Sequence, residues 1–448
     1  MHKKGKIILM VVLILLILVF WNRSQLKIHL LNQLVVLRGI LAPNCMWYNV
    51  SDLVLHDGAG VNLYNEYKQK YGAFVPSHMF NEKIYIVTSN KYIKTILENS
   101  PDIFSVGKLK KRFFKSFMAN NVGVSTGCPW KMRRHINERA LVTGYLHTYA
   151  KKYNMDMERQ LVKWQNAREL NYSNFEALGK TMVANIVFNE KRVSNDVFSV
   201  FSEANSPEVF FNPNFKLNPA VYNNYLRILK RYMQKPNRFS LIELVMKATK
   251  NQNEALHQIP HFIFPIVGLF VATIPRLLLL LCNHTKVFKE VIEEINASDG
   301  TYEGIYRLRF VRKCILETLR LNNPVITTFR TLTEDYRFDA KYSFKKGTQF
   351  LILNNPVLRE KEFYVHPNRF NPFRWTPQME QSFYALSFNQ GPQKCPGKEL
   401  AIYLVQCFMY HLVKVKSIGL SQSISTAKID SSNVPQVINP CKIRFYFN

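Results

Sequence analysis

One short segment places a cysteine in a setting suited to a metal-bound thiolate. In the sequence Phe388-Asn-Gln-Gly-Pro-Gln-Lys-Cys-Pro-Gly, Cys395 lies between Gly391 and Gly397. Glycine allows tight turns and a close approach of the backbone to a flat ligand, and Pro396 stiffens the chain after the cysteine. A helical pattern begins directly afterwards, and the dipole at its start would favour negative charge on the sulfur. A lone cysteine is more often a buried structural residue, so the surrounding pattern carries the interpretation.

The pattern FxxGxxxCxG in this segment resembles the haem-binding loop of the cytochrome P-450 superfamily. The resemblance implies that Cys395 is the axial ligand of the iron of haem b (iron protoporphyrin IX), and that Phe388, Gly391 and Gly397 shape the loop around the cofactor. A cysteine thiolate pushes electron density onto haem iron and favours cleavage of the O–O bond. The resemblance therefore implies an oxidoreductase of the monooxygenase type.

Further matches to this family predict donors to the haem propionates. Trp130-Lys-Met-Arg-Arg134 matches the family's WxxxR helix, and an indole N–H and a guanidinium are both suited to a carboxylate. Arg330 stands where the family has another propionate-binding arginine. Two residues before the cysteine the family usually has Arg or His, but this chain has Gln393, for which Lys394 is the candidate substitute. Taken alone, a WxxxR match would be an ordinary helix surface.

Two segments resemble the structural core beside the haem loop. Glu317-Thr-Leu-Arg320 is an ExxR pair, spaced so that both side chains lie on one face of a helix. Pro372-Phe-Arg-Trp375 resembles the family's PERF segment; it keeps Arg374 and replaces the glutamate by Phe373. The resemblance implies a Glu–Arg–Arg set with a structural role, formed by Glu317, Arg320 and Arg374.

The predicted central helix lacks one feature of the family's monooxygenases. These enzymes usually carry an acid–Thr pair in the pattern (A/G)GxxT, which relays protons during O–O bond cleavage. The corresponding stretch, residues 267–276, contains Gly268 and Thr273 but no Asp or Glu. Thr273-Ile-Pro275 resembles the sterol-hydroxylating branch, which makes Thr273 the candidate catalytic residue, and Arg276 is a loose candidate for the arginine of peroxide-driven members. A kinked helix without catalytic meaning explains the same residues equally well.

An uninterrupted apolar run of 15 residues, Ile7 to Trp21, indicates a membrane helix. It spans about 22 Å, less than a hydrocarbon core of roughly 30 Å, and the flanking Lys6 and Arg23 could snorkel to close the gap. No small-x-small cleavage pattern follows, so we expect an uncleaved single-pass anchor in a membrane of the endoplasmic reticulum type. The amphipathic residues 26–41 either lie on the membrane or pack on the domain. Basic residues on both sides leave the orientation open.

The remaining chain shows no linker, repeat or low-complexity tract. We therefore predict an anchor with a juxtamembrane helix over residues 1–43 and a single haem-thiolate domain over residues 44–448. Residues 110–319 have mostly helical patterns, whereas the strand-like pieces are short. These pieces are Ile84–Val87, Thr327–Arg330 and Gln349–Leu353. The fold class is thus mainly α with small β-sheets, a cytochrome P-450 fold preceded by an N-terminal membrane helix. The apolar stretch Ile259–Cys282 is interrupted by proline, histidine and arginine, which favours a buried core helix over a second membrane span.

Composition limits the classes of partner. The formal net charge is +29, but the basic residues are spread along the chain without a DNA-binding motif, so nucleic acid is an unlikely partner. A basic surface suits anionic lipid or an acidic protein. No flavin or nicotinamide motif is present, so a monooxygenase of this sequence needs a separate NADPH-dependent reductase. We expect it to dock on a basic face near the cysteine loop, formed by Lys131, Arg133, Lys394 and Lys398.

The cysteines and the overall composition add two smaller predictions. Seven scattered cysteines without a CxxC pair predict reduced thiols rather than a disulfide framework. The abundance of Lys, Asn, Ile, Tyr and Phe is typical of an AT-rich genome. Together with the shortened form, it resembles divergent P-450-like proteins of large DNA viruses.

These observations predict a haem-thiolate monooxygenase that oxidises an apolar small molecule of the lipid or sterol class with O2. One alternative is an isomerase, dehydratase or peroxygenase of the same fold that uses hydroperoxides. Another is a catalytically inactive haem-binding relative, which the changes at Gln393 and Phe373 and the missing acid keep open. The sequence does not specify the substrate or the oligomeric state.

Overall fold

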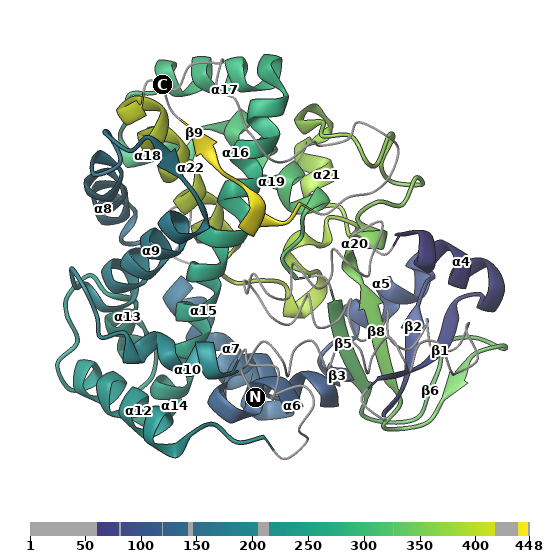
Figure 1. Cartoon of the computed structure of the whole chain (residues 1–448). Helices are drawn as coiled ribbons and strands as arrows, with labels where there is room; N and C mark the ends of the chain where they lie inside the picture. The colour runs from purple at the N-terminus through teal and green to yellow at the C-terminus, as the bar shows by residue number, and fades with distance from the viewer. Residues whose placement is uncertain are drawn as a thin grey trace, which may run out of the picture.

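The computed structural model describes residues 61–79, 82–118, 120–141, 147–204, 215–325, 327–416 and 438–446. The predicted anchor and juxtamembrane helix, residues 1–43, lie outside the described residues. The described chain is mainly helical with small β-sheets (Figure 1), which confirms the predicted fold class for this part of the protein.

Helices form the larger part of the molecule, with α8, α9, α12 and α13 on the left in Figure 1. Their apolar residues pack into one large core, as expected for helices that each carry an apolar stripe. The α-helices are α4 (Val61–Tyr71), α5 (Asn90–Glu98), α6 (Lys108–Met118), α7 (Gly127–Leu141), α8 (Ala150–Val162), α9 (Tyr172–Val183), α10 (Asp196–Ala204), α12 (Pro219–Gln234), α13 (Leu241–Ala248), α14 (Gln252–Gln258), α15 (Pro260–Gly268), α16 (Ile274–Asn283), α17 (Thr285–Ala297), α18 (Tyr302–Tyr306), α19 (Arg309–Leu321), α20 (Asn354–Val357), α21 (Pro377–Gln381) and α22 (Lys398–Lys416).

A five-stranded mixed sheet lies beside the helices (Figure 1), in the order β1-β2-β8-β5-β3. Strands β2 and β8 are parallel, with Tyr85 opposite Phe350, and the other neighbours are antiparallel. The three predicted strand pieces fall in β2, β5 and β8, so these predictions are confirmed. The strands are β1 (Phe74–Met79), β2 (Glu82–Val87), β3 (Phe104–Val106), β4 (Glu169–Leu170), β5 (Thr327–Leu332), β6 (Tyr336–Arg337), β7 (Ser343–Phe344), β8 (Gln349–Leu353) and β9 (Phe445–Tyr446).

A long helix runs through the core from Gln252 to Asn283 and consists of α14, α15, the π-helical segment η3 (Leu269–Thr273) and α16. It is long and apolar enough to cross a membrane, but 78% of its most apolar window is buried inside the protein. This burial supports the predicted core helix.

The π-helical segment has a local cause in the sequence. The N–H of Ile274 donates to the carbonyl of Leu269, five residues earlier. Pro275 follows at once; it has no N–H to donate, and its ring would collide with the carbonyl four residues before it in a regular α-helix. The wider turn relieves this conflict, and such π-bulges are frequent at functional sites.

The cysteines depart from the prediction at one position. Cys128, Cys282, Cys314, Cys395 and Cys407 are free, whereas Cys441 is disulfide-bonded. The prediction of reduced thiols is therefore wrong for Cys441. Sequence spacing did not reveal this bond because a disulfide depends on the distance between two residues in space, not along the chain.

Candidate active site around Cys395

The loop that carries Cys395 is shaped by its own backbone and by helix α5. The N–H of Cys395 donates to the carbonyl of Phe388 at 2.8 Å, which closes the loop. Gly391 has a φ of +72°, and a Cβ atom at this position would lie 2.3 Å from the carbonyl oxygen of Leu97. Both the backbone angle and this contact require glycine. The Cys395 loop is thus held against the C-terminal end of α5.

The electrostatic surroundings of the Cys395 thiol act in two directions. The side chain is exposed, yet enough protein surrounds it that desolvation raises its pKa. A backbone hydrogen bond from Gly397 and the positive charges of Arg134 and Lys398 act to lower the pKa. The loop thus supplies a hydrogen bond and positive charge to a thiolate. Coordination to a metal cation would complete the deprotonation.

An ion-pair network fixes the start of α22 directly after the loop. The guanidinium of Arg312, on α19, binds the carboxylates of both Glu380 and Glu399. Lys398 pairs with Glu380 at 2.8 Å, and the hydroxyl of Tyr306 donates to Glu399 at 3.1 Å. Three segments far apart in the sequence therefore meet at the start of the helix that follows Cys395. No sequence pattern had indicated this network.

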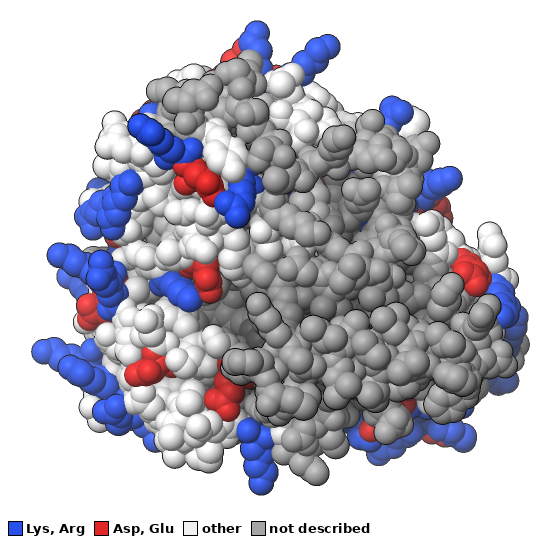
Figure 2. Space-filling model, in the orientation of Figure 1, with Lys and Arg blue, Asp and Glu red and all other residues white. Residues whose placement is uncertain are grey.

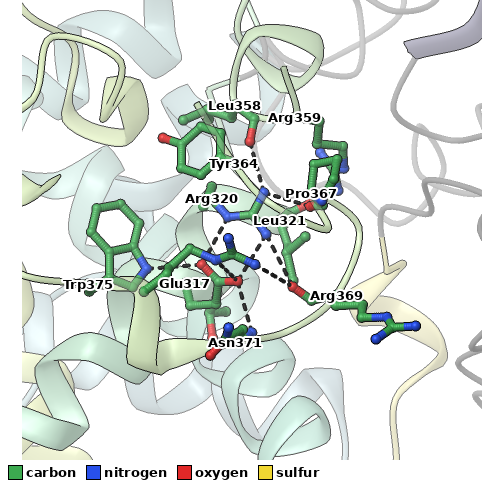
Figure 3. Close-up of polar contacts among 12 residues, drawn as sticks. Glu317, Arg320, Leu321, Leu358, Arg359, Tyr364, Pro367, Arg369, Asn371 and Trp375 are labelled. Atoms are coloured by element: carbon green, nitrogen blue, oxygen red, sulfur yellow. Dashed lines mark hydrogen bonds and ion pairs between the residues drawn. The ribbon is translucent and has the colours of Figure 1, made fainter. Parts of the chain in front are cut away.

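The predicted structural set is assembled around a buried carboxylate (Figure 3). Glu317 accepts two hydrogen bonds from Arg320, both at 2.9 Å, and one from the Nε of Arg374 at 3.1 Å. The indole N–H of Trp375 and the backbone N–H of Asn371 each donate to it at 2.9 Å. Burial alone would raise the pKa of Glu317, but the arginines and the Asn371 N–H lower it below its ordinary value. Sequence reasoning missed Trp375, although a buried indole N–H usually needs an acceptor.

The same arginines also hold the chain that leads to the Cys395 loop. Arg320 donates to the carbonyls of Leu358 at 2.9 Å and Pro367 at 2.7 Å (Figure 3), and Arg374 donates to that of Val365 at 2.8 Å. Backbone carbonyls of an irregular segment need such donors when they are removed from water. The network therefore stabilises the irregular segment that precedes the loop.

One of the predicted propionate donors, Arg134, contacts the Cys395 loop. Trp130 and Arg134 are both buried on α7, and Arg134 donates from Nη1 to the carbonyl of Lys394 at 2.6 Å. Its Nε pairs with Glu138 at 2.7 Å. Lys394 thus contributes its backbone carbonyl, while its side chain is exposed. Helix α7 is bonded directly to the residue before the candidate ligand.

Arg330 provides the sharpest test of whether a haem carboxylate fits this site. Its side chain is buried on β5, with Nε donating to the hydroxyl of Ser100 and Nη1 to the carbonyl of Phe329, both at 2.8 Å. Its Nη2 has no hydrogen-bond partner among the described residues. A buried donor without an acceptor is costly, and burial lowers the pKa of Arg330 to about 10. An anionic carboxylate would accept a hydrogen bond from Nη2 and would balance the buried positive charge. The residues present therefore fit a haem propionate.

Thr273 lies at the end of the π-helical segment. It is buried, and its hydroxyl has no hydrogen-bond partner among the described residues. Arg276 is also buried, but its Nε donates to the carbonyl of Ile438 at 2.8 Å and its Nη1 points at that of Asn322 at 3.4 Å. Arg276 thus anchors the backbone of the C-terminal segment, which does not favour a role in peroxide chemistry.

The predicted basic face is partly neutralised. Lys131 lies 3.6 Å from Asp102, and Arg133 turns inward to form a bidentate pair with Glu254. Arg133 is therefore not part of an exposed face, because its helix side faces α14 rather than solvent. Figure 2 shows Lys and Arg side chains spread over the visible described surface rather than gathered in one patch.

Cys395 is the candidate metal ligand of this region. In the part of the chain that the structure describes, no group of three or more His, Cys, Asp and Glu side chains is arranged to hold a metal ion. A single thiolate that binds a metal needs a prosthetic group to supply the remaining ligands, as haem does.

Comparison with known proteins identifies the family. Residues 233–415 match the family model described as cytochrome P450. Putative cytochrome P450 120 of Synechocystis is 21% identical over 374 residues, which cover 78% of this chain and 84% of that protein. The structure of retinoic acid-bound cyanobacterial CYP120A1 is similar with a TM-score of 0.69 and 18% identity, over 88% of this chain and 95% of that one. Residues 233–415 and the fold of the described chain are therefore those of the cytochrome P450 superfamily.

Some relatives are similar over a shorter range. Beta-amyrin 28-monooxygenase of Solanum lycopersicum is 30% identical over 145 residues, which cover 32% of this chain and 30% of that protein. The alignments to the first curated relatives span between 28% and 47% of their lengths. Membership of the superfamily implies a haem cofactor.

Proposed function

We propose that the protein is a haem-thiolate monooxygenase that oxidises an apolar small molecule of the lipid or sterol class, using O2 and electrons from a separate reductase. The Cys395 loop carries the proposal, since its closed backbone, the glycine held against Leu97 and the N–H of Gly397 present a single sulfur for coordination. A relative named as a monooxygenase supports the reaction class.

The residues that would hold haem b come from three parts of the fold, namely the Cys395 loop, α7 and β5. Cys395 would bind the iron, while Trp130 and Arg134 from α7 and Arg330 from β5 would bind the propionates. When bound, haem supplies the oxygen chemistry, and the thiolate tunes it by donating electron density. The protein contributes orientation, exclusion of water and the placement of protons.

Thr273 is the residue that we assign to proton placement. Its hydroxyl is buried and has no hydrogen-bond partner in the described part of the chain, so it is able to donate to a bound ligand without first breaking a hydrogen bond there. Pro275 deprives the preceding turn of one backbone donor. A carbonyl freed in this way could hold a water molecule near the hydroxyl.

A hydroperoxide-using isomerase, dehydratase or peroxygenase is the second candidate function. It is favoured by the absence of Asp and Glu from residues 267–276. A hydroperoxide substrate brings its own O–O bond, so it needs neither external electrons nor a relay of protons from a carboxylate. A catalytically inactive haem-binding protein is the third candidate.

Spectroscopy and turnover separate these candidates. The full chain, expressed with haem supply, should give the long-wavelength Soret band of thiolate-ligated haem when it is reduced under CO, and Cys395→Ser should abolish it. Product formation with NADPH and a generic reductase supports the monooxygenase, and product formation with a hydroperoxide alone supports the second candidate. Haem binding without turnover under either condition supports the third, and a chain that binds no porphyrin refutes all three.

We also propose that the protein is attached to a membrane through its N-terminal segment and receives electrons through the exposed lysines near the loop. The apolar run Ile7–Trp21 supports the first part, and Lys394 supports the second. Extraction of membranes with alkaline carbonate should leave the full chain in the membrane and release a variant without residues 1–43. Release of both chains would contradict the anchor.

A further inference from the structure

Helix α6 begins directly over strand β5, next to Arg330. Val106 pairs with Arg330 across strands β3 and β5, and a Cβ atom on Gly107 would lie 2.5 Å from that of Phe329. The N–H of Lys108 then donates to the hydroxyl of Thr331 at 3.2 Å. The chain is thus packed on β5 immediately before Lys110, which lies in the first turn of α6.

Arg330 is buried and Lys110 is half-buried, and the two cations are close enough for their charges to interact. The pKa of Lys110 is lowered to about 8, first by burial and then by the charge of Arg330. Neither residue forms an ion pair with a carboxylate within the described ranges of the chain. A buried cation normally has such a partner, because an unpaired charge is costly away from water. The missing partner is the first sign of a ligand.

The titratable side chain next to Lys110, His261, adds no negative charge to this region. His261, on α15, has a pKa lowered to about 4, first by burial and then by the charges of Lys110 and Arg134. It is therefore neutral at pH 7, and its Nδ1 lies 2.7 Å from the amide oxygen of Asn121. The region around Lys110 thus has an excess of positive charge.

Arg330 gives an independent sign that the missing group is an acceptor. Its buried Nη2 has no hydrogen-bond partner among the described residues. The end of α5 connects Arg330 to the Cys395 loop. Ser100, two residues after this helix, accepts a hydrogen bond from Arg330, and the carbonyl of Leu97 within the helix lies against Gly391 of the loop. The orphaned nitrogen therefore lies close to the end of the helix that supports this loop.

We propose that Lys110 and Arg330 together form a binding site for a carboxylate, with Arg330 at its buried end. The planar guanidinium offers a directed N–H, and the ammonium adds a compact charge, so the pair suits a single anionic carboxylate. The carboxylate comes either from a haem propionate or from an apolar substrate that ends in a carboxylic acid. Lys110 would then provide the propionate contact that Gln393 does not offer. The propionate source rests on the proposed function.

The first experiment measures how firmly haem is held. Haem transfer from the full-length holoprotein to excess apomyoglobin is followed for wild type, Lys110→Met and Lys110→Arg. The matched control is Lys108→Met, on the same helical turn, because Lys108 is exposed and pairs only with Glu82 at the surface. Lys110→Met should release haem about 10- to 100-fold faster, as expected for a lost charge-assisted hydrogen bond. Lys108→Met should match wild type, and Lys110→Arg should restore most of the retention.

Haem dimethyl ester identifies the group that Lys110 binds. Its propionates carry no charge, so it should leave wild type and Lys110→Met at equal rates. Circular dichroism checks that the variant is folded; removal of a partly desolvated charge that has no carboxylate partner among the described residues is expected to leave stability unchanged or to raise it.

The second experiment tests the substrate source. Calorimetric titration of the same proteins with decanoate and with decan-1-ol compares an acid with an alcohol of equal chain length. If Lys110→Met weakens decanoate binding about 10-fold or more and leaves decan-1-ol unchanged, the carboxylate belongs to a substrate. If neither haem retention nor decanoate binding depends on Lys110, the inference is overturned. If the proposed function itself is wrong, neither wild type nor the variants bind porphyrin, so the haem-transfer experiment gives no signal in any of them. The titration with decanoate then decides the inference.

Discussion

The guanidinium of Arg134 donates to the carbonyl of Lys394 at 2.6 Å, so helix α7 is bonded to the residue directly before the candidate iron ligand. Arg134 therefore has two roles in our interpretation, to hold the Cys395 loop and to bind a haem propionate. We expect Arg134→Met to release haem about 10- to 100-fold faster in the apomyoglobin assay. Arg139→Met, at an exposed position of the same helix, is the control. Equal rates for both variants would show that Arg134 does not contribute.

The indole of Trp375 should contribute to stability through its hydrogen bond to Glu317. Trp375→Phe keeps an aromatic ring but leaves a buried carboxylate with one donor fewer. We expect a loss of about 1–3 kcal/mol in the free energy of unfolding, measured with urea. Trp164→Phe is the matched control, because that half-buried indole packs edge-on against Phe175 rather than on a carboxylate. A smaller loss for Trp375→Phe than for the control would contradict the assignment.

Gly391 and Gly347 form a natural pair for testing the Cys395 loop. Both have positive φ, but a Cβ atom at Gly391 would collide with the carbonyl of Leu97, whereas at Gly347 no atom lies within 4 Å. Gly347→Ala should cost about 1–2 kcal/mol for the backbone angle alone. Gly391→Ala should cost more than about 2 kcal/mol and also lower the haem content. Similar losses and full haem content in both variants would show that the contact with α5 is unimportant.

His147 should make the protein sensitive to mild acid. It is buried, and its pKa is lowered to about 4, mainly by burial, although the carbonyl of Ala140 acts in the opposite direction. Because the unfolded chain takes up the proton near pH 6.5 and the folded chain only near pH 4, stability is full above pH 6.5 and falls below it. We expect His147 to account for about 1–2 kcal/mol of the loss between pH 6.5 and 5.

Urea unfolding at these two pH values provides the check. His147→Gln should show a smaller loss of stability on acidification than wild type. His135→Gln, at an exposed position, should behave like wild type. A loss that is the same in all three proteins would rule out His147 as the group responsible.

Thr273 distinguishes two kinds of oxygen chemistry. Its hydroxyl makes no internal hydrogen bond among the described residues, so Thr273→Val should leave the free energy of unfolding nearly unchanged. If the hydroxyl places a proton in a monooxygenase reaction, the product formed per NADPH consumed should fall by roughly 10-fold or more. Turnover driven by hydroperoxide should be unaffected. Thr318→Val is the control for stability, since its hydroxyl donates to the carbonyl of Cys314 at 2.8 Å. An unchanged yield per NADPH would remove Thr273 from the mechanism.

The features that the sequence predicted well are those with a local signal. Gln349–Leu353 forms strand β8 with the predicted bounds, because a short apolar run, Phe350–Leu353, follows Gln349 and the turn at Gly347. The ExxR spacing placed Glu317 and Arg320 on one helical face. The central helix was expected to be buried because prolines and an arginine interrupt its apolar sequence.

The features that the sequence did not predict depend on contacts between distant segments. Arg312 binds Glu380 and Glu399 from two other helices, and no pattern around Arg312 reveals them. Arg133 was expected on an exposed face, but its partner Glu254 lies on the central helix. The sequence around Lys110 does not distinguish this lysine from its basic neighbours, whereas in the structure its charge interacts with that of Arg330. Periodicity indicates which face of an element is apolar, but not which element it meets.

The parallel pairing of β2 with β8 has a consequence for how the protein is made. Tyr85 faces Phe350 across a very large sequence separation, and closing so long a loop has an entropic cost before any contact can offset it. During synthesis, strand β2 therefore has no partner on the edge that will face β8 until the ribosome has produced β8. Arg330 and the Cys395 loop also emerge late, so we expect the cofactor to be captured after translation rather than on the nascent chain.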